Sequence, residues 1–373
     1  MQSILDHFSE LDEPRVEGRT LYPMEELLLL TICAVLSGAE SWVEIVLFGK
    51  HKLEWLKTLL SFENGIPSHD TLGDFFAALN AQKFETCFMK WMQTICPSLA
   101  GKIIAVDGKT VRRSHNKSAG QRAIHLVSAF ASEGEILLGQ LKTEEKSNEI
   151  TAIPELLDAI DIKGATVTID AMGCQTDIVE KIINGGGDYI LAVKNNQPTL
   201  YEAIESFFDT SMGSQFKNVP YTFHEQVEKD HGRIETRRCW SIGRLDWLES
   251  GTKDRWKNFS SVSMIESIRE IKGEISTERR YYIGSVPAEA QRVAYSVRKH
   301  WGVENQLHWV MDVAFNEDQC RARMGNSAQN LATIRRIALH LIRKDSERKV
   351  GIKASRFKAG IDDSYRAKIL GFV

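Results

Sequence analysis

Asp107, Asp170 and Glu304 are the residues of this sequence best suited to phosphoryl chemistry. Asp107 and Asp170 each end a short apolar run containing β-branched residues, so both carboxylates are predicted at strand ends. A carboxylate in that position is held by a buried strand and projects into the crevice where α/β sheets bind ligands. Because hard divalent cations such as Mg²⁺ prefer oxygen ligands, the two aspartates predict a shared cation site.

Glu304 supplies the third carboxylate that such a site needs. It lies in a segment of helical pattern, where His300, Glu304 and His308 recur every four residues and therefore share one helical face. Three carboxylates can hold two cations about 3.5–4 Å apart, which clamp the attacking and leaving oxygens during phosphoryl transfer. The three acids therefore predict a two-metal active site.

The same acids also have an ordinary structural interpretation. Strand-end aspartates often stabilise turns, and Glu304 would then be a surface acid of a helix. Asp312, two turns beyond Glu304, is a reserve candidate for the third acid. Residue types and spacing alone leave these alternatives open.

A zinc site is the alternative that the histidine-bearing helix suggests. Without an adjacent cysteine or a third histidine, metal-orienting or packing roles are favoured for His300 and His308. The six cysteines have no CxxC or other zinc spacing, which indicates reduced thiols in a cytosolic protein. They are Cys33, Cys87, Cys96, Cys174, Cys239 and Cys320.

The elements that must position the acids predict an α/β fold with a mixed sheet. Strands are predicted at 102–107, 123–130, 135–141, 165–170 and 189–193, and helices at 149–160 and 175–183. The first strand is expected to end in a tight turn at Asp107–Gly108. Three antiparallel strands followed by alternating helices and strands are typical of an RNase H-like domain with flanking helices.

Three domains are predicted along the chain. Residues 1–98 form a helical N-terminal domain, whose segment 67–72 is either part of a DNA-binding helix-turn-helix or the start of a helix in an accessory bundle. Residues 99–345 form the catalytic domain, with a β-rich insertion at about 212–286 before the last catalytic helix. Residues 346–373 are predicted to be a basic C-terminal tail.

The composition indicates an ordinary globular protein with uneven charge. It is 43% hydrophobic and 26% charged, and it has no apolar run long enough for a membrane span and no secretory signal pattern. The net charge is −3, yet residues 321–373 carry 13 Lys or Arg against 4 Asp or Glu. Such asymmetry suggests a polyanion partner, with a solvated helical tail as the alternative.

Several side chains near the predicted strands are candidates for DNA contacts. Lys109 follows the first acid and is a candidate phosphate ligand, with a solvated turn lysine as the alternative. Lys194, Asn195 and Asn196 follow the fifth strand, where backbone or base-edge contacts are favoured over turn chemistry alone.

The insertion contributes further candidates for DNA contact. Arg233 and Arg237 are basic, and Trp240 is suited to stacking on a splayed base. A strand with one buried and one solvated face explains these residues equally well.

Three acidic blocks of the sequence resemble those of bacterial DDE transposases. The blocks are Asp107–Thr110, Thr168–Gln175 and His300–Trp309. They closely resemble the ISAs-type, or H-repeat-associated, insertion-sequence branch, which accompanies Rhs elements. Further segments match that branch and extend the similarity over nearly the whole chain: Lys146–Pro154, Ala192–Gln197, His231–Arg233 and Asn316–Asp318.

The resemblance implies DNA strand cleavage and strand transfer at the ends of an insertion sequence. Asp107, Asp170 and Glu304 would bind two Mg²⁺ or Mn²⁺ ions, one activating water or a 3′-hydroxyl and the other stabilising the departing oxygen. The implied partner is double-stranded DNA, as terminal inverted repeats and as target. A homodimer is expected on DNA, because two ends must be paired, in the bacterial cytoplasm at the nucleoid and without a membrane partner.

The sequence departs from this family on the last catalytic helix. Many relatives carry Tyr, Arg and Lys at −7, −4 and +7 from the glutamate, where this chain has Val297, His300 and Met311. The phosphate-gripping roles of those positions therefore do not transfer directly. Arg298 and His300 are the candidates for DNA contact on this helix.

Two other functions remain open on the sequence alone. The first is a related nuclease that cuts DNA without joining strands. The second is a degenerate or domesticated protein that binds DNA without transposing. The intact acidic trio argues against degeneration, because nothing in the sequence disables the site.

Overall fold

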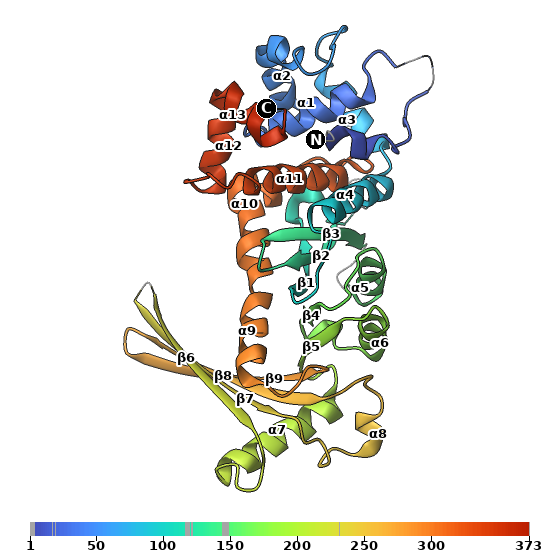
Figure 1. The fold of residues 1–373 in the computed structure, drawn as a ribbon. Coiled ribbons are helices and arrows are strands. Elements are labelled where there is room, and N and C mark those ends of the chain that lie inside the picture. Colours follow the sequence, from blue (N-terminus) through green and yellow to red (C-terminus); the bar gives the residue numbers. More distant parts are fainter. Residues whose placement is uncertain are drawn as a thin grey trace.

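Strands between residues 103 and 284 join one mixed sheet. We describe it from a computed structural model that covers residues 4–16, 18, 20–115, 120, 122–143, 149–230 and 232–372 (Figure 1). The strands in this part of the chain are β1 (Ile103–Thr110), β2 (His125–Ala131), β3 (Ile136–Thr143), β4 (Thr166–Ile169), β5 (Asp188–Val193), β6 (Thr222–Asp230), β7 (Arg233–Ile242), β8 (Ser261–Ile271) and β9 (Glu274–Gly284). Their order in the sheet is β3-β2-β1-β4-β5-β9-β8-β7-β6.

Helices cover both faces of this sheet and form a separate helical layer. Those of the N-terminal half are α1 (Met24–Leu36), α2 (Trp42–Leu56), α3 (His69–Ala78), α4 (Ala81–Ile95), α5 (Glu149–Asp158) and α6 (Thr176–Asn184). Those that follow are α7 (Pro198–Gly213), α8 (Ser250–Lys253), α9 (Ala290–His300), α10 (Trp309–Phe315), α11 (Ser327–Arg343), α12 (Ile352–Ile361) and α13 (Asp363–Leu370).

The first five strands have the RNase H-like arrangement that the order of elements predicts. β1 pairs with β2 and β2 with β3 in antiparallel fashion, whereas β4 pairs in parallel with both β1 and β5. The apolar, β-branched runs of β1 and β4 are buried on both faces, as expected for central strands between helices. The prediction of an α/β fold of this class is confirmed.

Two helical layers enclose these strands. α5 packs on β2 and β3 and α6 on β5, while α9 crosses β1, β4 and β5 on the opposite face (Figure 1). α9 continues through a π-helical turn into α10, which gives the long vertical rod in the figure. The acids of β1 and β4 therefore meet the last catalytic helix across one sheet face.

The predicted β-rich insertion extends the central sheet. β9 pairs antiparallel with β5 from Ile190↔Gly284 to Val193↔Tyr281, and β8, β7 and β6 follow in turn. In Figure 1 the far ends of these strands project beyond the rest of the molecule, and α7 lies beneath their roots. The insertion is therefore anchored by backbone hydrogen bonds to the strand next to β4.

The N-terminal region is helical, as its sequence predicts. Ser41 caps α2 in a capping box with Glu44, and α1 is buried along almost its whole length against α2 and α11. Residues 57–68 separate α2 from α3, far more than the 3–4 residues of a helix-turn-helix. The exposed residues of α3 include Asp70 and Asp74, and only two residues separate α3 from α4, so whether this domain binds DNA stays a prediction.

Residues 346–373 differ from the basic tail that their composition predicts. They contain α12 and α13, which pack on α1, α10 and α11. Arg356 is buried and donates hydrogen bonds to carbonyls at the C-terminal ends of two helices, Val35 of α1 and Ala314 of α10. Its guanidinium also lies 4.3 Å from the ring centroid of Phe315. A count of charges fails here because it does not distinguish a solvated arginine from one that caps helices.

No helix in the described part of the chain combines the length and the apolar composition needed to cross a membrane.

Replacing Arg356 with methionine tests the structural role of the C-terminal helices. The substitution keeps an apolar stem but leaves the terminal carbonyls of α1 and α10 without their donors. We expect the free energy of unfolding, measured by urea denaturation, to fall by about 2–4 kcal/mol. Lys353→Met, at an exposed position of the same helix, should change it by less than about 0.5 kcal/mol. Equal stability of the two variants would contradict this role.

Candidate active site

Parallel pairing of β1 with β4 sets the positions of the two aspartates. The pairing ends with Val106 opposite Ile169, so Asp107 is the next residue of β1 and Asp170 is the first residue after β4. Residues at matching positions of parallel neighbours project from the same face, and the strands lie about 4.8 Å apart. The sheet therefore brings the two acids together, although they are separated by the whole of β2, β3 and α5 in the sequence.

Gly108 serves a different purpose from the tight turn that the sequence suggests. β1 continues to Thr110, so the predicted end of the strand at Asp107–Gly108 is wrong. A Cβ on Gly108 would lie 2.4 Å from Oε1 of Glu149 and 2.4 Å from Nε2 of His125. These two buried groups are 2.6 Å apart in a hydrogen bond, and only glycine lets them pack against β1.

Sequence patterns did not predict the hydrogen-bonded pair of His125 and Glu149 that packs against Gly108. The hydroxyl of the exposed Thr110 lies 2.8 Å from Nδ1 of His125, so a hydrogen-bonded row runs from Thr110 to the buried His125 and Glu149 on the face of β1 opposite Asp107. The one available signal was Gly108 itself, directly after the acid. Nothing in the sequence indicates that β2 and α5 supply its neighbours.

Glu304 lies on a π-helical turn, η6 (Val303–His308), between α9 and α10. Val303 and Leu307 are buried and hold this turn against the protein, while Glu304 is exposed. The turn contacts β1. Single π-helical turns inside longer helices occur frequently at functional sites, where they change the direction of a side chain.

One pocket joins the three acids. It has a volume of about 150 Å³, and Asp107, Asp170 and Glu304 all line it. His300 also lines the pocket, with its Nδ1 3.1 Å from the hydroxyl of Thr168 on β4. This contact ties the helix that carries Glu304 to the strand that carries Asp170.

The pocket concentrates negative charge around Asp107. Burial above all, and then the carboxylates of Asp170, Glu304 and Glu149, raise the pKa of Asp107 to about 7, against a hydrogen bond from the N–H of Gly108 that lowers it. A buried carboxylate surrounded by others is stabilised by a bound cation. The electrostatics therefore fit a metal site.

The donor set also fits hard cations, since Asp107, Asp170 and Glu304 offer only carboxylate oxygens. Over the described residues, no three His, Cys, Asp or Glu side chains are gathered closely enough to form a ready-made metal cluster. The acids thus share one pocket without forming a closed ligand set.

A buried charge network supports Asp107 from the side of α10 and α11. Nδ1 of His308 lies 3.4 Å from Oδ2 of Asp107. The ammonium of Lys109 forms ion pairs with Asp312 and Glu317 and donates to the carbonyl of His308 at 3.3 Å. The side chain of Lys109 is only 9% exposed and its ammonium is held by these two carboxylates, while the phosphate contact suggested by the sequence stays a prediction. Asp312, the reserve candidate for the third acid, is its ion-pair partner.

The residues that follow β5 lie at the mouth of the pocket. Lys194 is exposed and lines the pocket, and Asn195 is exposed beside it. The amide of Asn196 donates a hydrogen bond to the carbonyl of Ala171, directly after Asp170. Asn196 therefore fixes the loop that follows the second acid.

The predicted arginines lie around a second, adjoining cleft. Arg233, Arg237 and Arg298 line it, and Arg237 and Arg298 both pair with Glu228, at 2.8 and 3.2 Å. Trp240 lies on the other face of β7, against Phe216 and Phe223. His231 and residues 146–148 of the recognised motifs lie outside the described residues.

Two aspartates on paired strands and a glutamate on the following helix define the DDE class of nucleotidyl-transfer sites on an RNase H-like sheet. The comparison with known families agrees. Residues 99–341 match the family described as "Transposase DDE domain", and residues 5–92 match its "DDE_Tnp_1-associated" partner domain. This chain belongs to the DDE transposase family.

Relatives of nearly equal length support this assignment. The chain is 42% identical over 374 residues to the "H repeat-associated putative transposase YhhI" of Escherichia coli K12, covering 99% of this chain and 98% of the relative. It is 41% identical over 373 residues to the "Putative transposase YncI" of Escherichia coli O157:H7, covering 99% and 95%. A solved piggyBac transposase synaptic complex with hairpin DNA aligns at a TM-score of 0.43 and 10% identity, over 95% of this chain and 75% of that one.

The buried Glu317 beneath the site predicts a pH dependence of stability. Burial alone would raise the pKa of Glu317, but Arg336 and Lys109 outweigh it and lower the pKa to about 2. Because this value lies below the ordinary 4.5, the network stabilises the fold above about pH 4.5 and loses that effect as the pH falls towards 2. We expect Glu317→Gln to lower the free energy of unfolding at pH 7 by roughly 3 kcal/mol or more.

Urea denaturation at pH 7, 4 and 3 checks this expectation. Wild type should lose up to about 1.4 kcal/mol per pH unit more than Glu317→Gln below pH 4.5. Glu180→Gln, on the exposed side of α6, should follow wild type. Parallel curves for wild type and Glu317→Gln would refute the assigned pKa shift.

Proposed function

We propose that this protein is a DNA transposase that cuts DNA strands at the ends of an insertion sequence and joins them to target DNA. The observation that carries the proposal is the register of β1 with β4, which sets Asp107 beside Asp170 in a pocket that Glu304 also lines. Membership of the DDE family supports this class of reaction. Phosphoryl transfer depends mainly on positioning and charge stabilisation, which such a pocket offers.

Asp107, Asp170 and Glu304 are the residues that would hold two Mg²⁺ or Mn²⁺ ions. When bound, the ions activate a water or 3′-hydroxyl and stabilise the departing oxygen. Because the pKa of Asp107 is raised, a cation bound beside it would strongly favour the deprotonated form of this carboxyl group. Asp170 accepts a hydrogen bond of 3.0 Å from the N–H of Met172, which fixes its carboxylate.

Other residues at the pocket have distinct proposed roles. Lys194 is an exposed cation at the pocket wall and is suited to a DNA phosphate, with Asn195 beside it. Asn196 acts through the loop after Asp170, and His300 acts by holding α9 to β4. We therefore assign phosphate contact to Lys194 and positioning to Asn196 and His300.

The proposed partner is double-stranded DNA, first as the terminal inverted repeats of the element and then as the target. Two ends must be brought together for a coordinated transfer, so we propose a homodimer on DNA. The proposed place of action is the bacterial nucleoid.

Isosteric replacement of each acid tests the reaction. The substrate is a labelled duplex that carries the inverted repeats flanking the gene, and the readout is Mg²⁺-dependent nicking on a denaturing gel. We expect Asp107→Asn, Asp170→Asn and Glu304→Gln each to reduce nicking at least about 100-fold, because even groups that only support metal ligands contribute 10–100-fold. Glu180→Gln should nick like wild type, and chelation of the metal should stop every reaction.

The products separate the three candidate functions. Joining of the cut strand to a target plasmid supports a transposase, whereas nicking without joining indicates a simple nuclease. DNA binding without Asp107-dependent nicking, in a protein that melts like wild type, would indicate a binding-only protein and refute the proposal.

A further inference from the structure

The strands of the insertion present two different faces, and one of them is turned towards α9. Side chains alternate along each strand, so neighbours in sequence point to opposite sides. Glu235 of β7 lies directly opposite Arg269 of β8, and Ile265 of β8 lies opposite Arg280 of β9. All four residues line one cleft between this sheet face and α9, with a volume of about 260 Å³.

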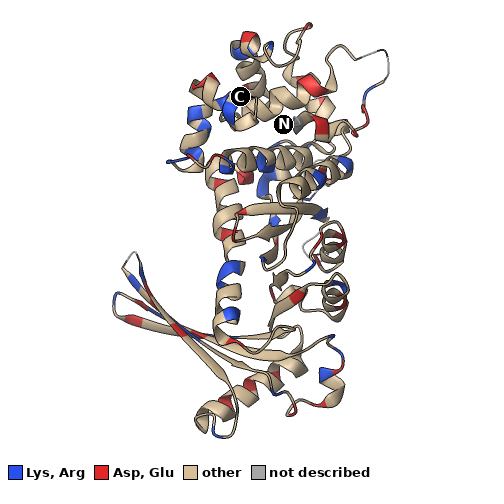
Figure 2. Ribbon diagram, viewed as in Figure 1, with Lys and Arg blue, Asp and Glu red and all other residues tan. Residues whose placement is uncertain are grey.

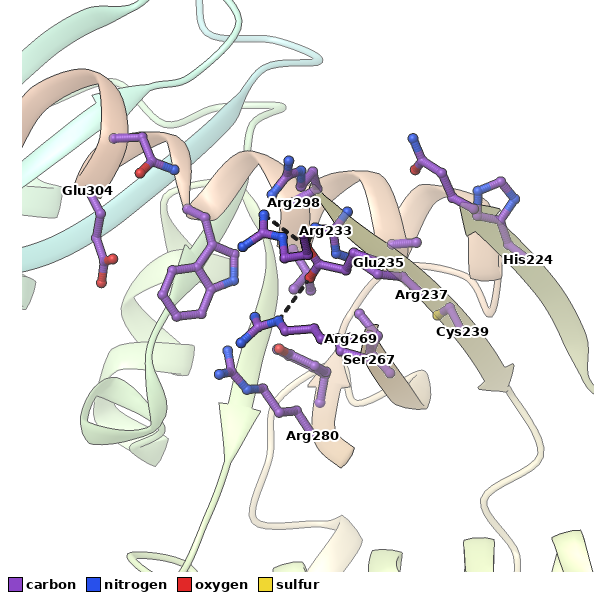
Figure 3. A pocket seen from close by; sticks show the side chains of 17 residues that line it. His224, Arg233, Glu235, Arg237, Cys239, Ser267, Arg269, Arg280, Arg298 and Glu304 are labelled. Carbon is purple, nitrogen blue, oxygen red and sulfur yellow. Dashed lines mark hydrogen bonds and ion pairs between the residues drawn. The ribbon is translucent and has the colours of Figure 1, made fainter. Parts of the chain in front are cut away.

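This cleft is positively charged and continues into the pocket of the acids. Its lining contains five arginines and two glutamates, which gives +3 with neutral histidine. Arg280, Tyr282, Trp301 and Glu304 line both spaces. Figure 2 shows basic residues on α9, and Figure 3 shows the arginines on one side of the cleft with Glu304 on the other.

A single buried carboxylate gathers three of these arginines. Glu235 is 3% exposed, and its oxygens lie 3.3 Å from Arg233, 2.8 Å from Arg237 and 3.3 Å from Arg269 (Figure 3). Burial raises the pKa of Glu235, but Arg237 and Arg269 outweigh it and hold the pKa below its ordinary value. The carboxylate is therefore charged and acts as the fixed centre of the array.

The side chains of the three arginines differ in how much of each is exposed to solvent. Arg237 is 17% exposed and also pairs with Glu228, so it belongs to the scaffold. Arg233 and Arg269 are 45% and 43% exposed, and each guanidinium has five N–H donors, more than its contact with Glu235 uses. Their remaining donors are available to a ligand in the cleft.

Arg280 stands where the cleft meets the acidic pocket. Its guanidinium forms a two-point contact with Glu278 at 2.8 and 3.1 Å and lies 4.9 Å from the ring centroid of Trp301. These contacts fix the plane of the guanidinium. A planar, oriented guanidinium is suited to two-point binding of a phosphate.

We propose that Arg233, Arg269 and Arg280 grip successive backbone phosphates of the DNA strand that enters the acidic pocket, with Glu235 as the residue that positions the array. This inference rests on the proposed function for the identity of the substrate. A row of separated guanidiniums in an open cleft is suited to an extended polyanion. Because the cleft is continuous with the acidic pocket, a DNA strand bound in the cleft would reach Asp107 and Asp170.

The opposite face of the same strands supplies matched controls. Arg279, next to Arg280, points away from the cleft and pairs with Glu266 at 2.9 Å and Asp209 at 3.1 Å. Arg238, next to Arg237, pairs with Glu225 at 2.6 Å. Substitutions of neighbouring residues therefore change the charge of the chain equally but alter only one face.

The test measures binding of the full-length protein to a fluorescent duplex by anisotropy, without divalent metal and over a series of salt concentrations. We expect Arg280→Gln and Arg269→Gln to raise Kd about 5- to 50-fold and to reduce the salt slope by about 1 each. Arg279→Gln should stay within about twofold of wild type. Arg269→Lys keeps the positive charge but loses the planar guanidinium that can bind a phosphate at two points. It should therefore weaken binding less than Arg269→Gln.

Glu235→Gln separates positioning from general electrostatics. It makes the protein more positive, so a purely electrostatic cleft would bind DNA more tightly. The positioning role predicts weaker binding, by several-fold, with a thermal melt that confirms folding. Equal Kd and slope for Arg280→Gln and Arg279→Gln, or tighter binding by Glu235→Gln, would overturn the inference. Nicking that depends on Asp107 would then still support the proposed function, so the two failures are distinguishable.

Discussion

Parallel hydrogen bonding between β1 and β4 is the constraint on which the site depends. The register that places Val106 opposite Ile169 also places Asp107 beside Asp170, and a shift of one residue would turn one aspartate to the other face. Because both strands are buried on both faces, such a shift would be costly, since it would force each core side chain to pack against the opposite helical layer. The geometry of the acids is thus a consequence of strand packing.

Three other parts of the molecule complete the site around Asp107 and Asp170. The rod formed by α9, the π-helical turn and α10 brings Glu304 across the same face, and the contact of His300 with Thr168 holds it there. Lys109, paired with the half-buried Asp312 of α10 and the buried Glu317, braces β1 from the side of α10. The insertion joins the same sheet through β5 and β9, so its arginines are held in register with the acids.

Local pattern predicted the strands, their order, the RNase H-like class and the segment that carries Glu304. These features follow from short-range apolar periodicity, which the sequence displays directly. The continuation of β1 beyond Gly108 could not be predicted, because it depends on antiparallel pairing with β2, from Gly108↔Val127 to Thr110↔His125. The ion pairs of Lys109 could not be predicted for a similar reason, since their acidic partners are about 200 residues away in the chain.

The pairing of the insertion with β5 and the burial of Arg356 also depend on distant partners. Charge composition shows how many arginines a segment has, but only the fold shows whether each meets solvent, a carbonyl or a carboxylate. The arginines of the insertion illustrate this point, because Arg279 and Arg280 are adjacent in sequence and face opposite environments.

The most direct test of the account is a crystal structure of the protein with duplex DNA and Mn²⁺, analysed by anomalous scattering from the metal. We predict two anomalous peaks about 4 Å apart, in contact with Asp107, Asp170 and Glu304. No peak at the aspartates, or peaks from which Glu304 stays remote in the DNA complex, would contradict the claim that these three acids form one catalytic centre.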